Sequence, residues 1–77
     1  MPYAYDAYVT QNARRVAETE RIATEQRSVI ARLEGVGIDT GRARELLAAY
    51  EDTLSLLRTI QVELEGHSRR LLDFDRR

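Results

Sequence analysis

Two long stretches without a helix breaker, joined by a short glycine-containing link, constrain the fold of this chain more than any other feature. Residues 6–34 contain neither Gly nor Pro and are dominated by good helix formers such as Ala, Arg, Glu and Gln. Residues 42–65 also lack both breakers. Because a short link between long helices favours an antiparallel pair, we predict an all-α, antiparallel two-helix hairpin, with helices at about 6–34 and 40–65 or longer.

The spacing of the apolar residues indicates helices rather than strands, since no stretch alternates with a period of two. The first stretch repeats every seven residues, at Val9, Val16, Ala23 and Ile30. The second carries a three–four stripe, formed by Leu47, Tyr50, Leu54, Leu57, Gln61, Leu64, Ser68 and Leu71. We expect these two stripes to form the inner seam of the hairpin.

Two polar residues on these stripes, Asn12 and Gln61, are expected to lie at the same level. A buried amide pair fixes the register of two helices at some loss of stability, and we favour this interpretation. Two alternatives remain open: a polar slot for a ligand or ion inside a bundle, and amides that reach water in a loose bundle.

The link contains the expected turn and cap residues, Gly35, Gly37, Asp39 and Thr40. Gly35 suits a left-handed position just after the first helix, and Gly37 provides a second permissive position. Asp39 or Thr40 is expected to cap the second helix by accepting a hydrogen bond from a free backbone N–H. The two apolar residues of the link are expected to plug the end of the hairpin.

A second stripe of the C-terminal helix lies beside the inner one. Its members are Leu46, Ala49, Thr53, Leu56, Ile60, Glu63 and His67. A two-helix seam uses only one narrow stripe, so the second stripe requires a further helix. A second copy of the hairpin is the simplest source, which predicts a homodimer in the form of a four-helix bundle. The expected dimer interface is Leu46, Leu56, Ile60 and Val62.

The chain is expected to form one domain over residues 1–77, in which residues 67–77 are an amphipathic, basic C-terminal tail. Gly66 weakens a helix at this point, so the tail is free to continue the helix, kink or turn back. Tyr and Arg are favoured at protein interfaces. The expected partner-facing residues are Tyr3, Tyr5, Arg69, Arg70 and Phe74.

Glu63 and His67 are the weak candidates for metal ligands. They stand four residues apart, so both side chains fall on one face of a helix, and a His and a carboxylate can share one metal ion. No Glu-x-x-His motif of the kind used by di-iron bundles occurs in the chain. A solvated His near a helix end is therefore the preferred interpretation, and no metal or other cofactor is expected.

Composition argues against several function classes. The chain has a single His and lacks both a phosphate-binding Gly-rich loop and a nucleophile turn. Because few residues could serve in catalysis, we expect a non-enzyme. Arg pairs and Tyr residues gather near the termini, yet a net charge of −1 disfavours nucleic-acid binding. Without an apolar run of ~18 residues or a signal-like N-terminus, a cytoplasmic protein without membrane contact is expected.

The link and its surroundings carry a resemblance to a known group. Gly37-Ile38-Asp39-Thr40 is followed by Ala43 and by Leu46-Leu47, a G-x-D-T-x-x-A-x-x-L-L motif. With the apolar positions on either side, at about residues 16–60, the chain resembles a group of short, uncharacterised alphaproteobacterial helical-hairpin proteins. The resemblance implies a helical hairpin. It carries over no functional residues.

These observations favour a small adaptor or regulatory protein that acts through a self-associating hairpin and binds an unknown protein partner. The alternative is a ligand- or metal-holding four-helix bundle that uses Glu63, His67 and the layer of Asn12 and Gln61. A nucleic-acid-binding protein is the least favoured class.

Overall fold

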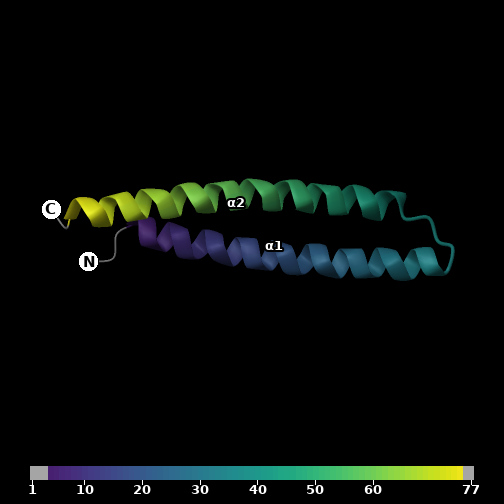
Figure 1. Cartoon of the computed structure of the whole chain (residues 1–77). Helices are drawn as coiled ribbons and strands as arrows, with labels where there is room; N and C mark the ends of the chain where they lie inside the picture. Colours follow the sequence, from purple (N-terminus) through teal and green to yellow (C-terminus); the bar gives the residue numbers. More distant parts are fainter. Residues whose placement is uncertain (1–3, 76–77) are drawn as a thin grey trace.

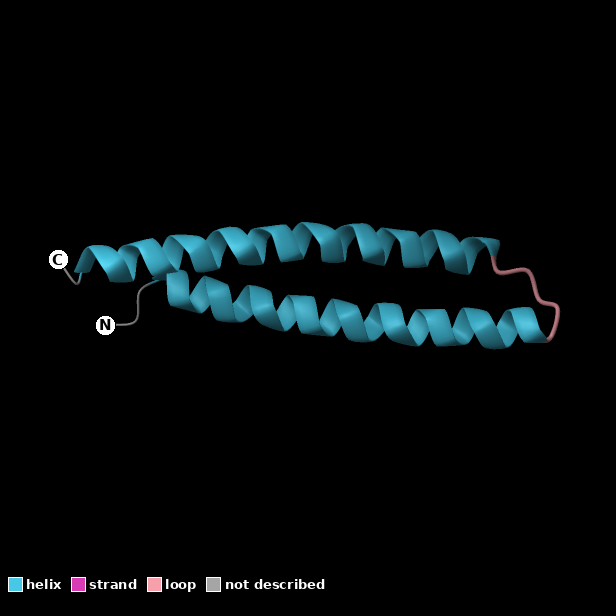
Figure 2. Ribbon diagram, viewed as in Figure 1, coloured by secondary structure: helices cyan, strands magenta, loops and turns pink. Residues whose placement is uncertain are grey.

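The computed structural model describes the backbone of residues 4–75 and the side chains of residues 6–71. This part of the chain forms two long helices, α1 at Ala4–Gly35 and α2 at Gly41–Asp75, which lie side by side and run in opposite directions (Figures 1 and 2). The predicted all-α hairpin is therefore confirmed. α1 extends slightly beyond both of its expected ends, whereas α2 begins one residue later than expected and takes the longer option at its C-terminal end. Over the described residues, neither helix contains a segment long and apolar enough to cross a bilayer.

The seam between α1 and α2 follows the predicted stripes. Ala23 is fully buried, and Ile30 and Leu54 are 5% exposed. Val9 and Val16 are half-buried, as are most members of the inner stripe of α2. Ala23 has a small side chain, which lets the helices approach each other at the middle of the seam. No large side chain is fully buried in the described part of the chain, so the core is thin.

Gly66 does not break α2, and the predicted tail continues as helix to Asp75. The end of α2 extends past the first turn of α1 (Figure 1). An interior Gly lowers helix stability by about 1 kcal/mol relative to Ala, a loss that a long helix with a packed stripe tolerates. The tail is thus an extension of the hairpin, with no turn back over the described residues.

The link ends α1 with a Schellman motif. The Ile38 N–H donates to the Leu33 carbonyl at 3.0 Å and the Gly37 N–H donates to the Glu34 carbonyl at 3.1 Å. Gly37 occupies the left-handed position of this motif, with a φ of 77°. The expectation that Gly35 holds this position is wrong, because α1 continues through Gly35 in helical conformation.

The apolar residues of the link, Val36 and Ile38, do not plug the end of the hairpin. Val36 is 72% exposed and Ile38 is 51% exposed. The Schellman turn carries the chain around the end of α1 without folding these side chains into the seam. That part of the prediction is wrong, and it leaves two large apolar side chains in water at the loop end.

The start of α2 is fixed by side chains from both helices. The Asp39 carboxylate accepts a hydrogen bond from the Gly41 N–H at 2.9 Å, so Asp39 is the capping residue of the predicted pair. The buried Thr40 hydroxyl instead donates to the Glu34 carboxylate at 3.2 Å and accepts from the Arg44 guanidinium at 3.1 Å. Glu34 and Arg44 also form an ion pair, which closes a three-residue network across the link.

Candidate interaction surfaces

A polar contact crosses the seam near the end that bears the termini. The Asn12 amide donates to the Gln61 side-chain oxygen at 2.8 Å and to the Leu57 carbonyl at 2.9 Å. Asn12 is only 8% exposed, and Gln61 donates in turn to Glu65 at 2.9 Å. The predicted proximity of Asn12 and Gln61 is confirmed. Their amides bond to each other and to backbone, so they align the helices.

Three cross-helix ion pairs run along one side of the hairpin. They join Glu20 to Arg58 at 2.6 Å, Arg27 to Glu51 at 3.6 Å, and Glu34 to Arg44. Within each helix these residues recur every seven positions, and the sign of the charge alternates along both helices. Such flanking charges select the register and partner of a helix pair.

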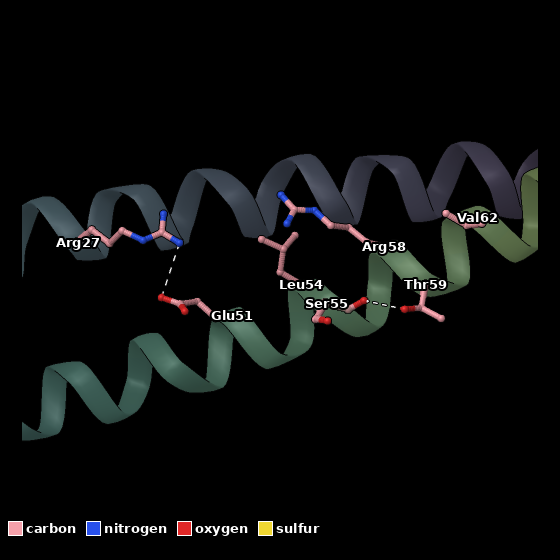
Figure 3. A pocket seen from close by; sticks show the side chains of 7 residues that line it. All are labelled: Arg27, Glu51, Leu54, Ser55, Arg58, Thr59 and Val62. Atoms are coloured by element: carbon pink, nitrogen blue, oxygen red, sulfur yellow. Dashed lines mark hydrogen bonds and ion pairs between the residues drawn. The ribbon is translucent and has the colours of Figure 1, made fainter.

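The side that carries these pairs is called the ion-paired face, and it includes a groove of about 460 Å³. The groove is lined by Arg27, Glu51, Leu54, Ser55, Arg58, Thr59 and Val62 (Figure 3). Leu54 and Arg58 reach from α2 toward α1, and the Arg27–Glu51 pair spans the groove (Figure 3). Each arginine here already faces a carboxylate, so the face has little net charge with which to hold an anion.

The opposite side of the hairpin, called the apolar face, has a different composition. Its two grooves, of about 420 and 290 Å³, share Gln11, Arg15 and Leu57. Tyr8, Ile60 and Leu64 line the smaller groove, and Thr19 and Thr53 line the larger one. Leu46 and Leu56 lie on the same side of α2 as Ile60, because intervals of fourteen and four residues are close to whole turns.

Large apolar side chains are exposed on this face. Leu56 is 61% exposed, Tyr8 58% and Leu46 48%, while Ile60 is half-buried. Because α1 already packs on the inner stripe of α2, it leaves Leu46 and Leu56 in water. This is the unsatisfied second stripe that the sequence predicts.

The four residues expected at a dimer interface do not share one face. Val62 is 70% exposed and lines the groove of the ion-paired face, whereas Ile60 lines a groove of the apolar face. Positions two residues apart in an α-helix point to nearly opposite sides, since one turn takes 3.6 residues. The structure therefore groups Leu46, Leu56 and Ile60 and separates Val62 from them.

Glu63 and His67 are both exposed on α2. The described residues contain no group of three or more His, Cys, Asp or Glu side chains that would surround a metal ion. The His67 ring lies 3.2 Å from the guanidinium of Arg70, and Asp6 accepts a long hydrogen bond of 3.4 Å from Ser68.

The expected partner-facing residues are only partly described. Arg69 and Arg70 are exposed near the end of α2. Tyr3 and the side chains of Tyr5 and Phe74 lie outside the described residues. On α1, the Arg21 guanidinium pairs with the Glu25 carboxylate at 2.8 Å. The exposed Arg21 guanidinium donates hydrogen bonds to the Glu18 and Glu25 carboxylates, and these bonds raise its pKa.

The ion-paired face is the feature that sequence reasoning missed. Its signal is readable in the chain: the residue numbers of each pair, 20 with 58, 27 with 51 and 34 with 44, give the same sum.

None of the protein-family models, curated proteins or solved structures compared with this chain matches it.

Proposed function

We propose that the chain is a non-enzymatic protein–protein interaction module of the cytoplasm, a small adaptor or regulatory protein built on a self-associating hairpin. In this proposal, the apolar face packs against a second copy to form a four-helix bundle. The observation that carries the proposal is the exposure of Leu46 and Leu56 beside the half-buried Ile60. Arg69 and Arg70 stay outside the bundle and are offered to another protein.

The surface area of the single hairpin supports association. The chain exposes 6198 Å², against about 4,800 Å² expected for a compact monomer of its mass. A standard interface buries about 800 Å² on each partner. The excess is large enough to supply such an interface.

The thin core supports the same conclusion. Among the described residues, the buried apolar side chains are Ala23, Ile30 and Leu54. Chains of this length usually need disulfides, metal or oligomerisation for stability, and this chain has no Cys. Packing of two apolar faces would bury Leu46, Leu56 and Ile60 and would enlarge the core.

The test compares glutamates on the two faces. We expect the wild-type protein to have the mass of two chains by light scattering and native mass spectrometry. Leu46→Glu combined with Leu56→Glu should give single chains, because both side chains are exposed in the hairpin and would be buried in the bundle. Val62→Glu, on the ion-paired face, is the matched control and should leave the dimer intact.

Circular dichroism of the same samples separates lost association from lost folding. A wild-type chain that stays single at high concentration would contradict the proposal. So would a double variant that remains a dimer.

A further inference from the structure

We propose that two copies dock through the apolar face in opposite orientations, with the loop of one copy beside the termini of the other. This inference rests on the proposed function and specifies its interface. The proposed two-fold axis passes at the level of Thr53. A two-fold interface is self-complementary, so each contact occurs twice.

The spacing along α2 supports a centre at Thr53. Leu46 and Ile60 lie seven residues before and seven residues after it, on the same stripe. In opposite orientations, Leu46 of one copy meets the partner's Ile60. Thr53 lines the larger groove together with Thr19, and these small side chains let the two copies approach at the axis.

The exposed apolar residues at the two ends also become neighbours. Leu71, 38% exposed, lies on the part of α2 that extends past α1. It is eighteen residues after Thr53, whereas α2 begins only twelve residues before Thr53, at Gly41, so in opposite orientations Leu71 reaches past the start of the partner's α2, to the level of its loop. The extension of each copy therefore covers Val36 and Ile38 of the other, which are otherwise in water.

Charge disfavours the alternative, in which both loops point the same way. That arrangement places each residue next to its own copy, and like charges that face each other across an interface are destabilising. Arg15, which lines both grooves of the apolar face, would meet the partner's Arg15. Opposite orientations instead place the two Arg15 side chains on either side of the axis, where they do not meet.

Single cysteines test the orientation, because the natural chain has none. Chains carrying Leu46→Cys and chains carrying Ile60→Cys are mixed, allowed to exchange and oxidised. We expect disulfide-linked dimers of one chain of each kind, and little linkage of either variant alone. The self-pairs would be fourteen residues apart along the bundle, about 21 Å.

Two further variants separate the possible failures. Thr53→Cys lies at the proposed axis and should link to itself, whereas Val62→Cys on the ion-paired face should not. Self-linked Leu46→Cys and Ile60→Cys would overturn the orientation while leaving the dimer standing. A dimer by mass in which Thr53→Cys does not link would overturn this choice of face. A chain that is single by mass would instead defeat the proposed function.

Discussion

The two faces of the hairpin share a seven-residue period but place different residue types on it, charged on one face and mainly apolar on the other. On the ion-paired face, the positions of this period carry Glu or Arg, and each is matched by its opposite across the seam. On the apolar face, the same period in α2 carries Leu46, Thr53 and Ile60. One face is completed by side chains of its own chain, whereas the other leaves apolar side chains in water. A hairpin can thus fix its internal register on one side and reserve the other side for association.

The alternating signs of the ion-paired face restrict the alignment of the helices. If α2 slid by seven residues against α1, Glu20 would face Glu51 and Arg27 would face Arg44. Like charges in such positions destabilise a helix pair. Asn12 adds a second restriction, because its amide needs the Leu57 carbonyl and Gln61 at one level.

The largest effect is expected in the seam between the faces. Leu54→Ala should lower the free energy of unfolding by about 2–5 kcal/mol, because it leaves a cavity in a core with few buried apolar side chains. The measurement is urea unfolding at a fixed protein concentration. Val62→Ala is the control on the ion-paired face and should change stability by less than about 0.5 kcal/mol. Equal losses would mean that the seam and this face are not distinct.

Asn12 tests whether the polar contact strengthens the seam. Asn12→Ala removes the donor to Gln61 and Leu57 and should lower the free energy of unfolding by about 1–3 kcal/mol. The neighbouring Gln11→Ala, at an exposed position of α1, serves as the control in the same thermal unfolding experiment. An Asn12→Ala variant as stable as wild type would show that the contact does not contribute to the free energy of unfolding.

Substitutions at Gly37 and Gly35 test which of the two glycines holds the left-handed position that ends α1. Gly37→Ala should lower the free energy of unfolding by about 1 kcal/mol, since its φ of 77° is unfavourable for a residue with a Cβ. Gly35→Ala should be neutral or stabilising by up to about 1 kcal/mol, because Gly35 is helical and its added Cβ meets nothing within 4 Å. Thermal unfolding of both variants gives the sign. Reversed signs would place the left-handed residue at Gly35.

The smallest effect is expected on the ion-paired face itself. Arg27→Glu should destabilise the hairpin by no more than about 1 kcal/mol, since exposed ion pairs contribute little. The exchanged pair, Arg27→Glu with Glu51→Arg, should restore most of the loss at low salt. Urea unfolding with and without added salt measures both. A single variant that loses its dimer would show that this face also takes part in association.

The sequence predicts the fold well because helix formers, breakers and the inner stripes all agree. The apolar positions of the seam follow from the spacing of the two inner stripes, and Asn12 lies level with Gln61 as predicted. The second stripe beside the inner one predicts that α1 leaves Leu46 and Leu56 exposed. Where one physical rule dominates a segment, the sequence is sufficient to predict the structure of that segment.

The local details escape prediction where two options have similar energies. Gly35 and Gly37 are both able to take a left-handed conformation, and the hydrogen bonds of the finished turn decide between them. Val62 looks like an interface residue by hydrophobicity alone, and its helical phase, two residues after Ile60, places it on the other face. The ion pairs escape because exposed charged side chains can pair in several ways, and the register of the two helices decides which pairs form.

The elongated outline of the hairpin affects how it behaves in solution. Its Cα radius of gyration is 17.8 Å, against about 11.5 Å for a compact chain of this length. A rod measuring 63 × 17 × 14 Å tumbles and diffuses more slowly than a sphere of equal mass, so a single chain elutes early from a sizing column and imitates a dimer. Two such rods aligned side by side thicken without lengthening. Small-angle scattering would register their pairing as a wider cross-section at nearly constant maximum dimension.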